Sequence, residues 1–253
     1  MQGKVVLNAW FVSDIHLKSI NERNSHKLLR FLLYLETQKV THLFLLGDIF
    51  DLWLGNSEMS HAEFEPIVSA IIRLKQKGVE VSYFEGNHDL HLQEFWQNKF
   101  SIPVYTEHEN FDLGPWKVRL EHGDLINQQD KSYLKLRSFL RHPKIESVLL
   151  KIPDQAVAVI GNTASRLSRK FSSERRKQDA GKIEEMIRTH AMAKCREDEF
   201  DYIITGHMHV RDDYSFQHNE KKVTSVNLGS WFEDTLALNL TDSGHRFVDV
   251  SSL

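Results

Sequence analysis

Five short segments of this sequence place Asp, Asn or His at the end of an apolar run. Each segment contains a glycine or an Asp/His pair. They are Asp14-Ile15-His16, Gly47-Asp48, Gly86-Asn87-His88-Asp89, His122-Gly123-Asp124 and Gly206-His207-Met208-His209. Carboxylate and amide oxygens and imidazole nitrogens suit Mn, Fe, Zn or Mg ions, and the absence of thiolates from the set argues against a structural zinc site. The segments therefore predict a site for divalent metal ions.

Each segment taken by itself has an ordinary structural explanation. Asp14 and His16 could belong to a solvated turn, Asn87 to Asp89 could cap a helix, and His207 and His209 could be surface residues. The metal interpretation depends on all five segments lying at the same topological edge of the fold.

The elements that would position these segments alternate between strands and helices. Buried strands are predicted at Ala9 to Ser13, Leu43 to Leu46 and Val79 to Phe84, with helices at Glu22 to Gln38 and Ala62 to Lys77 between them. Gly78 is predicted to cap the second helix. This alternation favours parallel strands joined by right-handed crossovers, with ligands bound at the carboxyl ends of the strands.

Asp48 follows the central predicted strand. Two metal ions held side by side share a bridging carboxylate, and Asp48 is the natural candidate because it lies between the other segments. Further along the chain, the patterns predict a helix from about Leu90 to Lys99 and then further strands. Those strands are on either side of the hairpin turn Leu113-Gly114-Pro115-Trp116, the second of them at Lys117 to Glu121. Later strands are at Phe200 to Thr205, on either side of His218-Asn219-Glu220, at Leu236 to Leu240 and at Arg246 to Val250.

The five segments, in this order, resemble the motifs of the calcineurin-like metallophosphoesterase superfamily, and they extend from Asp14 to His209. The resemblance implies an α/β fold, a two-sheet β-sandwich flanked by helices, with two divalent metal ions. Mn²⁺ is expected, with Fe, Zn and Mg as alternatives. One ion would be held by Asp14, His16, Asp48 and His209, and the other by Asp48, Asn87, His122 and His207.

The same resemblance implies catalytic roles for two further residues. His88 would contact the phosphoryl oxygens or protonate the leaving group, and Asp89 would orient His88. Asn87 and His207 would also face the substrate. These roles describe a metal-dependent hydrolase of phosphoric esters or pyrophosphates.

Within the superfamily, the chain looks most like the UDP-2,3-diacylglucosamine diphosphatases of lipid A synthesis. This similarity rests on Gly47-Asp48-Ile49-Phe50-Asp51-Leu52-Trp53 and on Tyr133 and Arg137 after His122-Gly123-Asp124. It implies hydrolysis of the pyrophosphate of UDP-2,3-diacylglucosamine to UMP and 2,3-diacylglucosamine 1-phosphate. One departure is His88, because the best-known branch of these enzymes has Arg there. The alternatives are another phosphodiesterase or phosphatase and, in a different class, a non-catalytic scaffold.

A basic segment interrupts an otherwise acidic chain. Lys131 to Lys182 contains 13 Lys/Arg and 4 Asp/Glu, a net charge of +9, whereas the rest of the chain has a net charge of -12. We expect one domain over residues 1–253 with this segment in a helical insertion at about 126–198. Arg166, Arg169 and Lys170 share a predicted helix face and are candidate substrate-binding residues.

The insertion also carries apolar residues, Val148 to Leu150 and Ala156 to Ile160. Basic and apolar residues together suit a lipid-bearing substrate or an anionic membrane surface. The alternative is an ordinary helical pair whose apolar residues pack on the sandwich. Nucleic acid is not expected, because aromatic residues are sparse in this segment.

The chain of 253 residues has one cysteine, Cys195, which fits a reducing compartment. No secretory signal or run of about 18 apolar residues is found. We therefore expect a cytoplasmic protein, with attachment to the inner face of the cytoplasmic membrane as the alternative. The sequence leaves the oligomeric state open.

Overall fold

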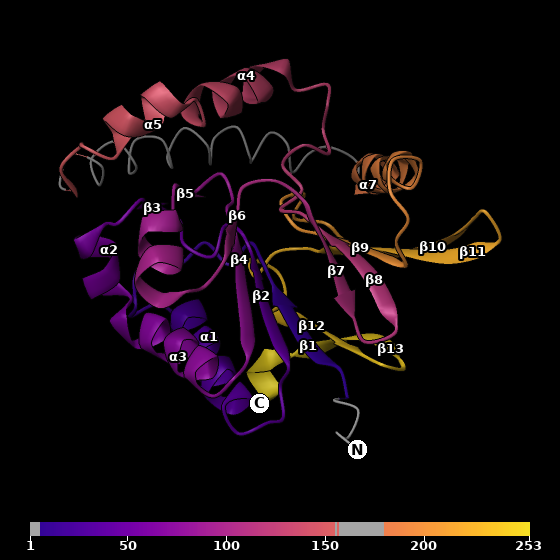
Figure 1. The fold of residues 1–253 in the computed structure, drawn as a ribbon, viewed down its shortest axis with the longest axis horizontal. Coiled ribbons are helices and arrows are strands. Elements are labelled where there is room, and N and C mark those ends of the chain that lie inside the picture. The colour runs from indigo at the N-terminus through magenta and orange to yellow at the C-terminus, as the bar shows by residue number, and fades with distance from the viewer. Residues whose placement is uncertain (1–5, 155, 157–179) are drawn as a thin grey trace.

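Two large β-sheets packed face to face form the centre of the structure (Figure 1). The structure, a computed structural model, describes residues 6–154, 156 and 180–253. Between the sheets, side chains such as Phe11 and Phe44 of the first sheet meet Val118, Ile204 and Val226 of the second in a buried apolar cluster. The sequence prediction of an α/β fold built on a two-sheet sandwich is confirmed.

The first sheet has six strands in the order β13-β12-β1-β2-β4-β6. Its parallel strands are β1 (Asn8–Val12), β2 (His42–Leu46), β4 (Glu80–Phe84) and β6 (Val104–Tyr105). The antiparallel strands β12 (Leu236–Thr241) and β13 (Gly244–Asp249) extend the sheet beyond β1. Strand β2 therefore lies in the middle of the sheet, and its carboxyl end points to the edge at which Asp48 follows.

The second sheet has five strands in the order β10-β11-β9-β8-β7. They are β7 (Glu109–Leu113), β8 (Trp116–Leu120), β9 (Tyr202–Thr205), β10 (Arg211–His218) and β11 (Lys221–Leu228). Strand β9 is parallel to both of its neighbours, β8 and β11, so the segments after β8 and β9 leave the sheet at the same edge.

Helices α1 (Arg23–Leu35) and α3 (Glu65–Gln76) cover the outer face of the first sheet. The helix predicted over Ala62 to Lys77 is present as α3, but its start was wrong: α2 (Glu58–Glu63) ends inside the predicted range, and α3 begins at Glu65, after Phe64. Pro66 in the first turn of α3 has no backbone N–H and favours a helix start. Gly78, at φ +90°, follows the end of α3 as predicted.

The helix predicted from about Leu90 also differs. Asp89–Leu90 is a short strand, β5, that pairs with β3 (Trp53–Leu54), and a π-helical segment then covers Gln93–Lys99. The chain ends in a 3₁₀ turn at Val250–Ser252.

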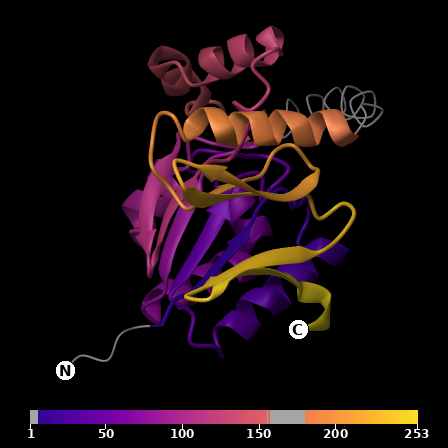
Figure 2. The same ribbon diagram turned by 90° about the vertical axis from the view of Figure 1, so that its right-hand side faces the viewer.

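Three described helices follow the segment His122 to Asp124. Helices α4 (Lys131–Leu140) and α5 (Pro143–Leu149) lie over the edge of the sandwich at which β2 and β4 end (Figure 1). Helix α7 (Ala180–Lys194) lies across the second sheet (Figure 2), where Ala191 and the following Cys195 pack on Ile203 and Val223. The described part of residues 126–198 contains no strand. That this segment is one helical insertion stays a prediction.

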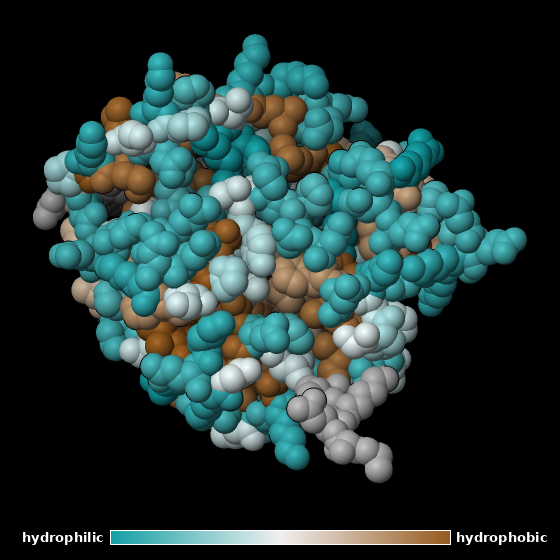
Figure 3. All heavy atoms as spheres, viewed as in Figure 1, coloured by the Kyte–Doolittle hydropathy of each residue, from teal (hydrophilic) through white to brown (hydrophobic). Residues whose placement is uncertain are grey.

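Exposed apolar side chains lie on the two helices above the edge of the sandwich. They are Leu136 and Phe139 of α4, Val148 of α5 and Leu150, and Figure 3 shows hydrophobic atoms among hydrophilic ones along this side. Among the residues that the structure describes, no helix combines the length and the apolar character needed to cross a membrane.

Candidate metal centre

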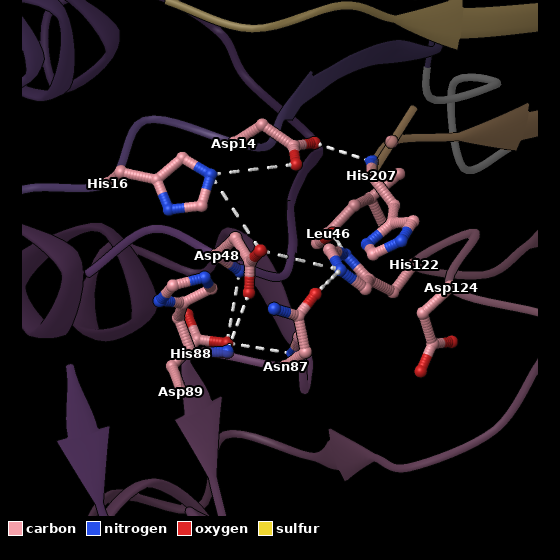
Figure 4. A network of polar contacts seen from close by, with 12 residues as sticks. Asp14, His16, Leu46, Asp48, Asn87, His88, Asp89, His122, Asp124 and His207 are labelled. Carbon is pink, nitrogen blue, oxygen red and sulfur yellow. Dashed lines mark hydrogen bonds and ion pairs between the residues drawn. The ribbon is translucent and has the colours of Figure 1, made fainter. Parts of the chain in front are cut away.

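The five polar segments meet at one edge of the sandwich (Figure 4). They follow strands β1, β2 and β4 of the first sheet and β8 and β9 of the second. The sandwich therefore closes the site from both sheets, because the carboxyl ends of these five strands face the same side.

Several predicted ligands have a backbone conformation that side-chain-bearing residues rarely adopt. Nine described residues other than glycine have positive φ, and five of them are Asp14, His16, Asp48, His207 and His209, at φ between 51° and 64°. Left-handed backbone costs free energy for such residues and is concentrated at functional sites. The local strain therefore marks the predicted site independently of residue type.

Two glycines allow the strand ends to approach closely. A Cβ at Gly47, which has φ +83°, would lie 2.5 Å from His122 Nδ1, and one at Gly86 would collide with Asp48 Oδ1. Any larger residue at either position would push Asp48 or His122 away from the centre.

The first group of candidate ligands consists of Asp14, His16 and His209. Asp14 Oδ1 lies 3.2 Å from His209 Nε2 and 3.9 Å from His16 Nε2, and the two imidazole Nε2 atoms are 3.2 Å apart. Asp14 Oδ2 accepts a hydrogen bond of 2.8 Å from the backbone N–H of His207, which ties the β1 and β9 ends together.

The second group consists of Asp48, His122 and His207. Asp48 Oδ2 lies 3.7 Å from His122 Nε2 and also 3.7 Å from His16 Nε2 of the first group. Asn87 Oδ1 adds a further oxygen 3.4 Å from His122 Nε2. Asp48 is the side chain that faces both groups, and its other oxygen accepts from the His88 N–H at 2.9 Å.

Backbone carbonyls orient two of the histidines. His122 Nδ1 donates to Leu46 O at 2.8 Å, and His88 Nδ1 donates to Asp51 O at 2.8 Å. In each ring, Nε2 then carries a lone pair when the imidazole is neutral and a second proton when it is charged. A ligand imidazole is commonly fixed in this way by a hydrogen bond from its other nitrogen.

The expected partnership of Asp89 with His88 differs from the structure. The buried Asp89 carboxylate accepts from the backbone N–H groups of Asp48, Ile49 and Gly86 at 2.7–3.0 Å and from the Tyr83 hydroxyl at 2.6 Å. It therefore fixes the turns that carry the ligands, while the His88 ring is held by Asp51.

Asp51 had no predicted role from the sequence. Its carboxylate, His16 and His88 form a third group whose polar atoms lie within 4.8 Å of one another. The spacing Gly47-Asp48-x-x-Asp51, with both carboxylates in one turn, is the sequence signal for this residue.

Burial and the surrounding charges shift the pKa values of the histidines at the site. Burial lowers the pKa of His16 and of His207 to about 4, so both rings are neutral near pH 7, which is the form that binds metal. Burial opposes protonation of His122 as well, but the carboxylates of Asp48, Asp14 and Asp124 raise its pKa to about 9.

The two central carboxylates shift in opposite directions. Burial favours the neutral form of Asp48, but the positive charges of His88 and His122 hold its pKa below the usual range. Burial and the nearby charge of Asp48 raise the pKa of Asp89 to about 7. Asp48 therefore carries the negative charge at the centre.

The donor set fits divalent cations. All candidate atoms are carboxylate or amide oxygens or imidazole nitrogens, and the buried His207 Nδ1 has no hydrogen-bond partner among the described residues. Buried polar atoms are normally satisfied, so an unpaired nitrogen on a ring that is grouped with Asp48 and His122 suits a metal ligand. The clustered His and Asp side chains thus indicate metal binding.

Helix α4 is fastened to the rim of this site. Asp124 accepts from the Tyr133 hydroxyl at 2.9 Å and from Arg137 Nε at 2.5 Å. Arg141 Nη1 donates to the buried Glu85 at 2.9 Å. Three of the predicted substrate-binding residues, Arg166, Arg169 and Lys170, lie outside the residues that the structure describes.

Comparison with known proteins identifies the family to which the chain belongs. The family model for calcineurin-like phosphoesterases matches residues 7–211, so the chain belongs to this family of hydrolases. Among curated proteins it is similar to two named UDP-2,3-diacylglucosamine hydrolase. One is from Stenotrophomonas maltophilia; it is 27% identical, and the match covers 92% of this chain and 95% of that protein. The other is from Neisseria meningitidis; it is 25% identical, and the match covers 92% of this chain and 94% of that protein.

Among solved structures, one described as a novel archaeal phosphodiesterase covers 96% of this chain and 99% of its own. Its sequence identity to this chain is 12%, and its TM-score is 0.48.

Proposed function

We propose that the chain is a phosphoesterase with two divalent metal ions, for which Mn²⁺ is the first candidate. We also propose that it hydrolyses the pyrophosphate of UDP-2,3-diacylglucosamine. The products would be UMP and 2,3-diacylglucosamine 1-phosphate. The observation that carries the metal part is the position of Asp48 Oδ2, 3.7 Å from an imidazole nitrogen of each group.

The residues divide into two ligand sets that share Asp48. Asp14, His16 and His209 would complete one set, and Asn87, His122 and His207 the other. Bound there, two divalent ions would neutralise phosphoryl charge and activate water for attack.

His88 would act on the phosphoryl group. Burial disfavours its charged form, yet the charge of Asp48 and the carbonyl of Asp51 raise its pKa, which favours a second proton on the ring. Because Nδ1 donates to Asp51, that second proton would be on Nε2. A positioned imidazolium can stabilise developing charge or protonate the leaving oxygen.

Two observations support a lipid-bearing substrate. Relatives that cover nearly the whole chain have this substrate in their names. The α4–α5 pair beside the site also exposes Leu136, Phe139 and Val148. A cavity of about 370 Å³ bordered by His122 has many charged side chains in its lining, including Glu107, Arg119 and Glu121, so the acyl chains are assigned to the α4–α5 side.

The same surface supports transient attachment to the cytoplasmic membrane. Lys135, Lys144 and Lys151 lie exposed among these apolar residues. Each Lys near an anionic surface adds about 1 kcal/mol to binding, and salt weakens the effect.

One feature favours a second candidate, a phosphodiesterase with another substrate. His88 stands where the best-known lipid A branch has Arg, and His is general among phosphoesterases of this superfamily. A non-catalytic scaffold is disfavoured, because a scaffold does not need two full sets of candidate ligands.

The test is hydrolysis of UDP-2,3-diacylglucosamine with Mn²⁺, compared with UDP-N-acetylglucosamine and bis(p-nitrophenyl) phosphate. We expect the acylated substrate to have the highest kcat/KM by at least about tenfold. Replacing Arg166, Arg169 and Lys170 by Ser should reduce that value and leave the small diester unaffected. Equal activity on all three substrates would favour the second candidate.

A further inference from the structure

An exposed aromatic ring borders the first ligand group. Phe232, in the loop between β11 and β12, is 49% exposed. Its ring lies parallel to that of His16, with centroids 5.2 Å apart and planes at 11°, and its centroid is 5.7 Å from that of His209. One face of Phe232 is covered by His16, so the exposed half is the face turned away from it.

The backbone beside Phe232 is held to the site. Trp231 is buried, and its N–H donates to Asp14 O at 3.2 Å. Its indole N–H donates to Leu236 O at 2.9 Å, and its carbonyl accepts from Asn24 at 3.1 Å. These contacts fix the position from which the Phe232 ring extends, so that a ligand need not order the loop on binding.

The two ends of the site differ in what borders them. Tyr133 of α4 lies beside the second group, with its ring centroid 5.6 Å from that of His207. Phe232 borders the first group, through His16 and His209. If the acylated sugar lies under α4 and α5, the other half of a nucleotide-sugar diphosphate extends toward Phe232.

We infer that the open face of Phe232 is the platform on which the planar base of the nucleotide stacks. The inference rests on the proposed function, because it assigns the nucleotide half of the same substrate. A ring that is fixed, half exposed and next to the phosphoryl site presents a flat apolar surface. Alanine substitution of a stacking aromatic weakens nucleotide binding about 5- to 100-fold.

The test measures binding of UMP to the Mn²⁺-loaded protein by isothermal titration calorimetry. Phe232→Ala should weaken UMP binding about 5- to 100-fold. Phe232→Leu keeps apolar cover on His16 but cannot stack, and should also weaken it. Phe232→Trp should restore affinity to the wild-type value or better. Leu33→Ala, an exposed apolar residue on α1, is the control and should not change it.

Bound Mn²⁺ is measured in each variant by elemental analysis, to separate stacking from support of the imidazoles. We expect the metal content of Phe232→Leu to equal that of the wild type. Unchanged UMP affinity in Phe232→Ala, or a loss of affinity that only follows a loss of metal, would overturn the inference. Hydrolysis of the acylated substrate is assayed separately, so its absence contradicts the proposed function without deciding the role of Phe232.

Discussion

Individual residues at the centre are fixed by hydrogen bonds from the backbone. Asp48 accepts from the N–H of His88, and Asp89 accepts from three backbone N–H groups around Asp48. The imidazoles of His122 and His88 each donate to a carbonyl. Side chains held in this way keep their geometry when charge changes at the site, as electrostatic catalysis requires.

At the residue scale, His88→Asn should lower the rate about 10²- to 10⁴-fold and leave metal content unchanged. The reason is that His88 is proposed to act on the phosphoryl group and not as a ligand. Steady-state hydrolysis of bis(p-nitrophenyl) phosphate and elemental analysis check this. Loss of metal in His88→Asn would make His88 a ligand.

Residue types and spacing were enough to predict the groups that meet at this edge. Asp14, His16, Asp48, His122, His207 and His209 all lie in the two groups. The partners of Asp89 could not be predicted, because its hydrogen bonds go to backbone N–H groups whose direction depends on the folded turns. The position of Phe232 beside the site could not be predicted either, because a single Phe in a loop belongs to no periodic pattern or motif.

At the scale of elements, α4 is joined to the site by two arginines one helical turn apart. Arg137 reaches Asp124, and Arg141 reaches the buried Glu85 and the carbonyl of Gly86. These ion pairs place the helix directly over the ends of β4 and β8. The position of α4 is therefore coupled to the segments that carry Asn87 and His122.

Arg141→Met tests this attachment. It would leave Glu85 buried without its cationic partner, so the free energy of unfolding should fall by about 3–5 kcal/mol. Lys135→Met, on the exposed side of α4, is the control and should change it by less than about 0.5 kcal/mol. Urea denaturation measures both. Equal stabilities of the two variants would mean that the Arg141 pair does not hold the helix.

Cys195 reports on the packing of α7. Burial raises the pKa of this thiol to about 11 from an ordinary value of 9.0. The thiol should therefore react slowly with iodoacetamide at pH 8.5 in the native protein and rapidly in urea. As the pH rises, the thiol ionises in the unfolded chain at a lower pH than in the folded protein. The contribution of the buried, neutral thiol to the free energy of unfolding is therefore complete below about pH 9 and is lost toward pH 11. Equal rates in both states would contradict the packing.

The element predictions held where a local pattern decides the outcome. The parallel strands β1, β2 and β4 and the cap at Gly78 follow from apolar runs and a glycine. The break at Phe64 was missed, because the apolar periodicity continues across it while Pro66 starts a new helix. The packing of α7 on the second sheet depends on contacts far apart in the sequence, which periodicity does not show.

At the scale of the whole molecule, the centre depends on the two sheets keeping their relative position. Segments from the first sheet supply Asp14, His16, Asp48 and Asn87, and segments from the second supply His122, His207 and His209. Phe44 lies between the sheets, stacked on Phe11 with centroids 4.9 Å apart. The pairing of β12 with β1 and of β13 with β12 could not be read from the sequence, because strand order is set by long-range contacts.

Phe44→Ala should lower the free energy of unfolding by about 3–5 kcal/mol, since it removes a buried ring from the layer between the sheets. Leu33→Ala on the exposed side of α1 should change it by less than about 0.5 kcal/mol. Thermal and urea unfolding measure both changes. A small effect of Phe44→Ala would mean that this layer contributes little to stability.

Asp48 is proposed to join two metal-binding groups. The most direct test is equilibrium dialysis against Mn²⁺ followed by elemental analysis of the wild type and Asp48→Asn, with circular dichroism to confirm that both are folded. We predict two ions per wild-type chain, fewer in Asp48→Asn, and a fall of at least about 100-fold in hydrolysis of bis(p-nitrophenyl) phosphate. A wild type that is fully active with one ion or none, or an Asp48→Asn variant with two ions and full activity, would contradict the account.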